Sequence, residues 1–310
     1  MAYRKIMFLM PMLTTLITVV NSSAFVFLVA DQQLAQYISA SSIVSLIIWF
    51  THWIIPSIYS FQEKSLPEIR QAQFAVTAIG VVILNVFVPG AIAAAFATLL
   101  LVECGFFHSA LLIIYSKKEK FYILEFSRGI LNVLNLALCV LFFKGSPVYL
   151  VCGMVINVAI VGAVSYRSGN VAATVAAAPI SKRAITQTVG AALRSANTRL
   201  MLFSRAFEIT VILTLTHLEV LSMVVAVKLA VMVGQALSLN ARDVPASYIS
   251  FISGCFLAAV LVTLFQVESF WPNLLPTSLA AITWGDLLVA IIFQIPFTWL
   301  LCKSLQSRSI

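Results

Sequence analysis

The sequence predicts an all-α protein, a polytopic integral membrane helix bundle with about ten transmembrane helices. Apolar residues make up 61% of the chain and charged residues 10%, and the mean hydropathy is +1.04. These values lie outside the range of soluble domains. Apolar stretches recur along the whole chain, each close to the about 20 residues that a helix needs to cross about 30 Å of hydrocarbon. Backbone polar groups in lipid must be satisfied within each segment, so we expect every span to be a helix.

The apolar stretches define ten predicted spans, which are residues 6–30, 34–60, 73–89, 91–115, 121–143, 148–166, 200–217, 219–240, 246–267 and 284–302. The first follows a basic start and resembles a signal peptide with a cleavage site at Ser22-Ser23-Ala24. Its apolar run is longer than that of a signal peptide, so we expect a retained transmembrane helix. The segment 268–283 holds Trp271-Pro272 and Pro276, which suggests an interfacial or re-entrant piece, and whether it spans is left open.

The basic residues predict the orientation. Of the 19 Lys and Arg residues, fifteen fall in connections that a simple in–out alternation puts on one side, and only Lys144 falls on the other. The remaining three, Arg128, Arg205 and Lys228, fall inside predicted spans. Short basic connections face the cytoplasm, so both termini are predicted to be cytoplasmic. This bias accounts for the net charge of +8, and no nucleic-acid partner is expected.

One long connection, residues 167–199, divides the chain after the sixth predicted span. It separates an N-terminal six-helix lobe, 1–166, from a shortened C-terminal lobe of about four helices, 200–310. Its mildly amphipathic end carries Lys182 and Arg183, and then Arg194 and Arg199. Two interpretations stay open, a helix on the membrane surface and a solvated cytoplasmic linker.

The fifth predicted span carries a polar stripe at i, i+3, i+7 and i+10, formed by Glu125, Arg128, Asn132 and Asn135. These residues share a face about 80° wide. A charge in the bilayer costs several kcal/mol, so we expect the stripe to face a polar cavity, with Glu125 as the partner of Arg128. The alternative is an internal ion pair and amide contacts that hold helices together.

The seventh and eighth predicted spans carry further charges. Arg205 and Glu208 stand at i, i+3, and Lys228 shares a helix face with Gln235 and Ser238. Lys228 has no acid within a turn, which makes it the best candidate for contact with an anion. The predicted substrate-binding residues are Arg128, Arg205, Lys228, Asn132, Asn135 and Gln235, and the predicted ion-pair or coupling residues are Glu125 and Glu208.

Motifs of enzyme chemistry are missing from the sequence. It has no paired Asp-rich motif, no HExxH, no GxSxG and no Walker sequence, and its three histidines are widely spaced. The five cysteines lack metal-ligand spacing. We therefore expect no enzyme, no catalytic residues, no metal and no cofactor. Ser42 and His52 share a face of the second span, where we expect helix packing, and a proton-coupling role for Glu103 has no support.

Three segments, in the right order, resemble the polysaccharide/O-antigen flippases of the multidrug/oligosaccharidyl-lipid/polysaccharide exporter superfamily. Asp31-Gln-Gln-Leu-Ala-Gln-Tyr37 is similar to that family's acidic turn into a second helix. Residues 119–132, Glu-Lys-Phe-Tyr-Ile-Leu-Glu-Phe-Ser-Arg-Gly-Ile-Leu-Asn, resemble its entry into the fifth helix. Residues 199–235, with Leu218-Glu219-Val220-Leu221 at the turn, resemble its entry into the second lobe. The resemblance covers about residues 1–245.

The resemblance implies a V-shaped bundle of two six-helix lobes in the bacterial inner membrane. Such a protein moves lipid-linked sugars by alternating access through a cationic central cavity, where Arg128, Arg205 and Lys228 would contact a pyrophosphate. The implied partners are membrane lipid and a lipid-linked glycan, with a polysaccharide polymerase or glycosyltransferase as further partners. The family has twelve or more helices, so the second lobe here would lack two.

Two other functions remain open. A ten-helix drug/metabolite or nucleotide-sugar transporter fits the helix number, but its two five-helix repeats would place the boundary after the fifth span. The long break after the sixth predicted span, at residues 167–199, favours the flippase. A non-transporting membrane subunit of a polysaccharide synthesis complex fits the missing helices, whereas three intramembrane cations argue against a purely structural role.

Overall fold

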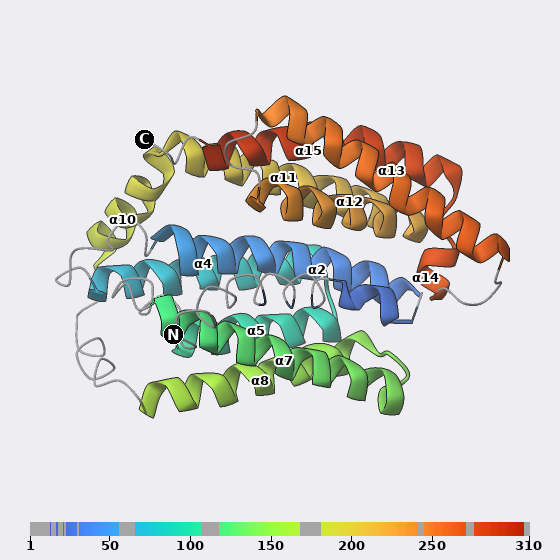
Figure 1. Cartoon of the computed structure of the whole chain (residues 1–310). Coiled ribbons are helices and arrows are strands. Elements are labelled where there is room, and N and C mark those ends of the chain that lie inside the picture. The colour runs from blue at the N-terminus through green and yellow to red at the C-terminus, as the bar shows by residue number, and fades with distance from the viewer. Residues whose placement is uncertain are drawn as a thin grey trace, which may run out of the picture. The chain divides into compact units, whose positions relative to one another are not determined.

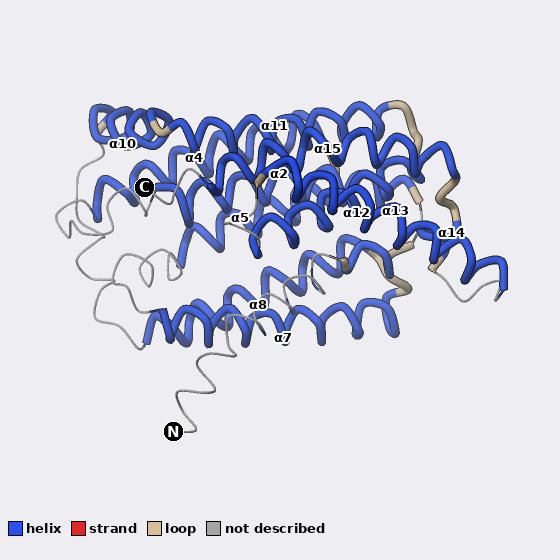
Figure 2. The backbone as a smooth tube through the Cα atoms, turned by 45° about the horizontal axis from the view of Figure 1, so that its top comes forward, coloured by secondary structure: helices blue, strands red, loops and turns tan. Residues whose placement is uncertain are grey.

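The described part of the chain is helical throughout. The computed structural model describes residues 13, 17, 21, 23–29, 31–55, 66–106, 118–167, 181–240, 245–270 and 276–306. Over these residues the backbone forms helices joined by short turns, and no strand occurs among them (Figure 2). The predicted all-α fold is therefore confirmed.

The chain divides into two compact units, each of which is described by itself. Unit 1 consists of Met1–Asn21, Ile43–Phe143 and Val148–Ser195. Unit 2 consists of Ser22–Ser42, Lys144–Pro147 and Ala196–Ile310. The last change of unit, at residues 195–196, comes close to the predicted start of the second lobe at 200. The predicted lobes are contiguous, whereas unit 2 also takes in two short segments from the N-terminal half.

Unit 1 is built around α4. Its helices are the second part of α2 (Gln32–Trp49), the π-helical turn η2 (Phe50–Ile54), α4 (Leu66–Phe87), α5 (Ala91–Phe106), α7 (Lys118–Phe143), α8 (Pro147–Arg167) and α10 (Lys182–Arg194). α4 packs against α5, α10 and η2. Gly80 permits close packing between α4 and α2, because a Cβ at this position would overlap the side chain of Ile47.

Unit 2 is built around α15. Its elements are η1 (Ala24–Phe27), the first part of α2, α11 (Ala196–His217), α12 (Leu221–Asn240), α13 (Ala246–Phe270), α14 (Thr277–Ala280) and α15 (Trp284–Gln306). α15 packs against α11, α12 and α13 (Figure 1). Buried hydroxyl and amide side chains line these contacts, with Gln294 donating to Ser253 and to Thr298. Small polar residues of this kind let apolar helices approach closely.

Several helix ends differ from the predicted ones. The first predicted span runs to residue 30, but Ala24–Phe27 form a 3₁₀-helix and Leu28 is extended. α4 begins at Leu66, so the predicted connection of residues 61–72 is helical in its second part. The predicted connection of residues 167–199 contains α10, a helix of 13 residues. The segment 268–283 contains α14, which is fixed by a hydrogen bond from Ser278 to the carbonyl of Val26.

Six helices of the described residues are long and apolar enough to cross a membrane, which indicates a helical membrane protein. They are Gln32–His52, Glu68–Phe87, Ile123–Phe143, Ala196–His217, Ala246–Val267 and Trp284–Ser304. Three shorter apolar helices, Ala91–Gly105, Pro147–Ala163 and Leu221–Gln235, coincide with the predicted fourth, sixth and eighth spans. The first predicted span lies mostly outside the described residues. The count of about ten and the cytoplasmic termini stay predictions.

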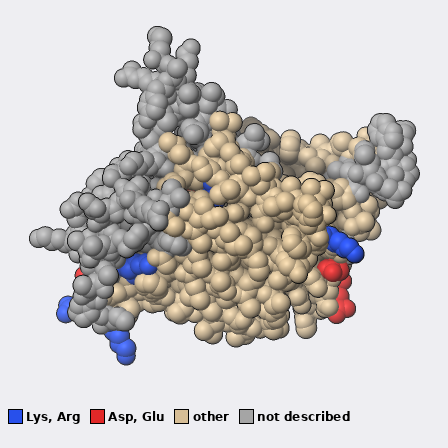
Figure 3. All heavy atoms as spheres, turned by 90° about the horizontal axis from the view of Figure 1, so that it is seen from below, with Lys and Arg blue, Asp and Glu red and all other residues tan. Residues whose placement is uncertain are grey.

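The described surface suits an apolar surrounding. On the face shown in Figure 3 it is almost entirely uncharged. Large apolar side chains are exposed on several helices, such as Leu141 on α7, where 74% of the residue is exposed, and Phe251 on α13, where 71% is exposed. Acyl chains of lipid cover such side chains without the cost that water would impose.

Gly234 offers a test of the packing at α15. A Cβ at this position would lie 2.6 Å from Thr298 Oγ1 and 3.1 Å from Gln294 Nε2, both fully buried side chains. Overpacking of a rigid contact costs about 1–3 kcal/mol. We expect Gly234→Ala to lower the melting temperature of the detergent-purified protein by several degrees.

The matched control for this substitution is Gly254→Ala, since a Cβ at Gly254 on α13 meets nothing within 4 Å among the described residues. Alanine has the higher helix propensity, so this variant should melt at or slightly above the wild-type temperature. Equal melting of both variants would contradict the packing of α12 on α15.

Candidate functional site: two buried charge clusters

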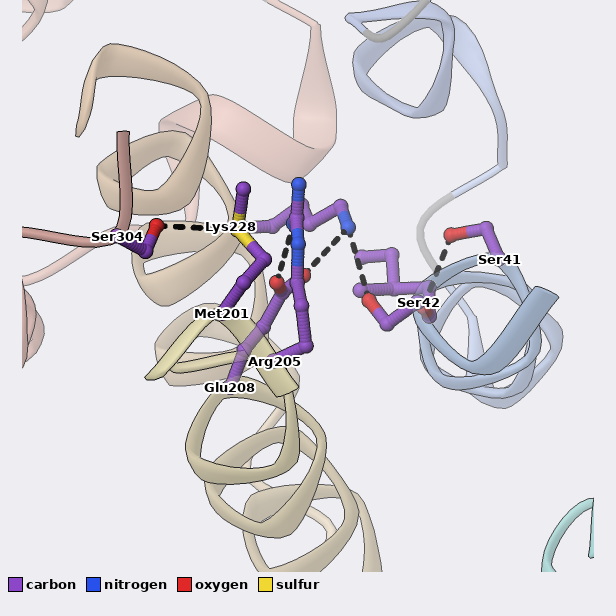
Figure 4. A network of polar contacts seen from close by, with 8 residues as sticks. Ser41, Ser42, Met201, Arg205, Glu208, Lys228 and Ser304 are labelled. Carbon is purple, nitrogen blue, oxygen red and sulfur yellow. Dashed lines mark hydrogen bonds and ion pairs between the residues drawn. The ribbon is translucent and has the colours of Figure 1, made fainter. Parts of the chain in front are cut away.

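Unit 2 holds a buried charge cluster centred on Glu208, here called the Glu208 cluster and formed by Arg205 and Glu208 of α11, Lys228 and Gln235 of α12 and Ser42 of α2. Arg205 Nη1 donates to Glu208 Oε2 at 2.7 Å. Lys228 Nζ donates to Glu208 Oε1 at 3.1 Å and to Ser42 Oγ at 2.8 Å. The two cationic side chains therefore converge on one carboxylate, that of Glu208 (Figure 4).

The Glu208 cluster is deeply buried and carries a surplus positive charge. The side chain of Glu208 is 1% exposed, that of Lys228 11% and that of Arg205 14%. Two cations face one carboxylate, and no other acidic residue of the described chain forms an ion pair with either of them. Charges in a low-dielectric interior are expensive, and each cation here recovers part of that cost from Glu208.

Local helix geometry positions these groups. Arg205 and Glu208 lie one turn apart on α11, so they meet as the sequence predicts. Lys228 and Gln235 lie two turns apart on one face of α12, and Lys228 directly follows a run of fully buried residues, Val224 to Val227. The hydrogen-bonding environment orients the Gln235 amide so that its oxygen accepts from the Arg205 guanidinium, with 3.1 Å to Nη2.

The first part of α2 completes the cluster from the N-terminal end of the chain. Ser39 Oγ and Thr216 Oγ1 lie 2.9 Å apart, and one turn further along α2 Ser42 accepts from Lys228. Both serines are buried. The polar face of this span therefore joins α2 to α11 and α12, and its contact with Lys228 is one that the sequence did not predict.

Unit 1 holds a second cluster, here called the Arg128 cluster and formed by Arg128 and Glu125 of α7 with Glu103 of α5. Arg128 Nη2 contacts Glu103 Oε1 directly, whereas Nη1 lies 4.0 Å from Glu125 Oε1. The pair of Arg128 with Glu125 that the sequence predicted is present as this longer contact, and Glu103 from another helix is the closer carboxylate. Two carboxylates face one arginine, so the charge balance is opposite to that of the Glu208 cluster.

A π-helical turn borders the Arg128 cluster. The turn places His52 in a buried position whose electrostatic surroundings include Arg128, Glu125 and the backbone of Glu103. Thr51 Oγ1 lies 3.4 Å from His52 Nδ1, and the amide of Gln73 on α4 donates to the Thr51 carbonyl at 2.6 Å. A π-turn widens the helix and leaves such a carbonyl available to a side chain.

The two asparagines of the predicted stripe make contacts between helices. Asn132 Oδ1 accepts from Asn157 on α8 at 3.0 Å, and Asn135 Nδ2 donates to the carbonyl of Leu150 at 2.8 Å. Gly153 on α8 leaves the space for Asn135, since a Cβ there would overlap its amide. These contacts agree with the alternative interpretation of the stripe, in which amides hold helices together, and the cavity stays a prediction.

The structure thus groups the predicted residues differently from the sequence. It brings Arg205, Glu208, Lys228 and Gln235 together in unit 2. It places Arg128 and Glu125 in a separate cluster of unit 1 and turns Asn132 and Asn135 toward α8. Lys228 has no acid within a turn of its own helix, as the sequence indicates, and pairs instead with Glu208 of the neighbouring α11.

Two contributors were missed, Ser42 and Glu103. A signal for Glu103 was available, because it is the one charged residue of the span 91–115. A single acid in an apolar span requires a partner from another span. No group of His, Cys, Asp and Glu side chains in the described ranges is arranged to hold a metal ion.

Comparisons of the chain with protein-family models, with curated proteins and with solved structures find no match in any of the three.

Glu208→Gln tests the central role of this carboxylate. The substitution keeps the shape but leaves two buried cations without an anionic partner, and the loss of one partner of a buried pair costs about 3–5 kcal/mol. We expect a large fall in melting temperature and in folded yield, whereas Glu219→Gln in the exposed turn before α12 should change neither. Adding Lys228→Met to Glu208→Gln should recover part of the loss, and no recovery would contradict the pairing.

A second pair of substitutions ranks the carboxylates around Arg128. The side chain of Glu103 is 3% exposed and that of Glu125 is 25% exposed. We expect Glu103→Gln to lower the melting temperature more than Glu125→Gln, because only Glu103 contacts the guanidinium directly. The reverse order in thermal unfolding experiments would restore Glu125 as the main partner.

Proposed function

We propose that the protein moves a lipid-linked oligosaccharide or polysaccharide precursor across the membrane, with the Glu208 cluster binding the phosphate or pyrophosphate of the lipid carrier. The surplus positive charge of this cluster is the observation that carries the proposal. Arg205 and Lys228 together exceed the charge of Glu208 by one unit in a site that is almost fully buried. An anionic group is the ligand that balances it.

The donors of the Glu208 cluster suit a phosphate. Arginine offers planar donors to phosphate oxygens, and lysine offers a compact point charge. The Nε atom of Arg205 is buried and has no hydrogen-bond partner among the described residues, so it retains a donor for a ligand. Ser42 and Gln235 add neutral polar groups to the two cations. Charge-assisted hydrogen bonds to a diphosphate are about twice as strong as neutral ones.

The chain organisation supports a flippase over the two alternatives. The last change of unit lies at residues 195–196, after α10, and not after the fifth predicted span, where two five-helix repeats would meet. The resemblance of residues 1–245 to polysaccharide/O-antigen flippases also implies a lipid-linked glycan as the substrate. A purely structural membrane subunit has no use for a buried surplus cation, whose burial costs stability.

The role of Arg128 differs from the one first expected. Its guanidinium faces two carboxylates, so the Arg128 cluster has no surplus positive charge to offer an anion. Asn132 and Asn135 are engaged with α8. We therefore assign anion binding to Arg205, Lys228 and Gln235, and assign the polar stripe of α7 to the cohesion of unit 1.

Deletion of the gene in its own host, followed by complementation, tests the proposal. The wild-type gene should restore surface polysaccharide and remove lipid-linked intermediates stranded at the cytoplasmic leaflet. Lys228→Met should not, because it deletes the surplus charge while the Arg205–Glu208 pair stays neutral and folded. Lys144→Met, in the exposed turn between α7 and α8, is the control and should complement fully.

Each other outcome names a different function. Complementation by Lys228→Met at unchanged protein level would contradict anion binding by the Glu208 cluster. A deletion strain that fails to make the lipid-linked intermediate, without stranding it, would favour a subunit of the synthesis complex. A deletion strain with normal glycan and normal intermediates would favour the transporter of a small metabolite.

A further inference from the structure

The helix α10 has one buried face and one basic face. Thr188 and Ala192 are buried, with Ile185 half-buried on the same side, and this side packs against α4 in unit 1. Arg183 and Arg194 are exposed and lie eleven residues apart. At 100° per residue they share the opposite face, about 16 Å from each other along the helix.

The basic face of α10 has no anionic partner among the residues that the structure describes. The helix Lys182–Arg194 contains no acidic residue. None of the ion pairs formed by the described side chains includes Lys182, Arg183 or Arg194. The apolar face of α10 packs against the protein, and its cationic face points outward. Such a cationic face is complementary to a negatively charged surface.

A hydrogen bond sets the level of α10 relative to the membrane-spanning helices of unit 1. The backbone N–H of Ser181, just before the helix, donates to the side-chain oxygen of Gln71 at 3.0 Å. Gln71 lies in the first turn of the candidate span Glu68–Phe87. The start of α10 is therefore held where a membrane span ends, which is the depth of the lipid headgroups.

Arg70 marks the same end of unit 1. Its guanidinium donates to the carbonyl oxygens of Cys104 and Gly105 at the end of α5, and it lies 4.2 Å from the ring centroid of Phe74. Arg70 thus caps the C-terminal carbonyl groups of α5. Lys182 and Arg183 lie exposed near this end and remain available to an outside partner.

We propose that α10 lies at the headgroup level of the membrane and binds the phosphate groups of anionic phospholipids through Lys182, Arg183 and Arg194. Basic residues next to an anionic membrane strengthen binding by about fivefold each. The three residues together are expected to raise the affinity for an anionic lipid over a zwitterionic one by at least tenfold. This binding is independent of the Glu208 cluster and of what the protein transports.

The test uses the purified full-length chain in an uncharged detergent. Phosphatidylglycerol is added in mixed micelles, and bound lipid is counted by native mass spectrometry alongside the melting temperature. The wild-type protein should retain phosphatidylglycerol and gain stability from it, and phosphatidylcholine should do neither. The triple variant Lys182→Gln, Arg183→Gln, Arg194→Gln should lose at least tenfold in apparent affinity.

Two controls separate charge from fold. Lys144→Gln removes one exposed cation from the turn after α7 and should bind phosphatidylglycerol as the wild type does. The triple variant Lys182→Arg, Arg183→Lys, Arg194→Lys keeps the charge and should keep the binding. If the triple variant fails to fold, the single variants Arg183→Gln and Arg194→Gln take its place. Each should lose about fivefold in apparent affinity for phosphatidylglycerol.

Two results would overturn the proposal. The first is equal retention of phosphatidylglycerol by the wild type and by the glutamine variants. The second is the same stabilisation by inorganic phosphate at matched concentration, which would identify a site for a soluble anion and not a lipid surface.

Discussion

The cost of leaving a charge unpaired in an apolar interior is the constraint on which the packing of this protein depends. Glu208 is 1% exposed and is reached by cations from two helices, and Glu103 is buried against an arginine of another helix. A buried carboxylate without its cation costs several kcal/mol, so these helices have one register in which both groups are satisfied. The ion pairs thereby select the register among apolar surfaces that would otherwise slide on one another.

The rest of each unit follows from that register. In unit 2 the serines of α2 contact α11 and α12 in the register that places Lys228 against Ser42. Around α15, hydrogen bonds between hydroxyl and amide side chains hold the helices in the same way. In unit 1 the amides of α7 meet α8, and Gly153 leaves them space. Lipid and apolar side chains are alike in polarity, so van der Waals packing and such hydrogen bonds supply the association of helices.

The charged residues of the two clusters and of α10 differ in burial and in charge balance. The Arg128 cluster has more carboxylate than cation and holds unit 1 together, whereas the Glu208 cluster has a surplus cation in a buried place. The cations of α10 lie exposed at the end of a membrane span, so they carry no cost of burial. Position in the fold, and not residue type, therefore separates a structural charge from one that is available to a ligand.

The sequence by itself determined the helical class, the approximate position of the described apolar helices and the ion pair between Arg205 and Glu208. All three depend on hydropathy or on helical spacing within one segment, which are local properties. The tertiary structure decided that Lys228 shares Glu208, that Glu103 is the closer partner of Arg128, and that Asn132 contacts α8. Those contacts depend on which helices are neighbours and at what register, and an apolar stretch of about 20 residues carries almost no record of either.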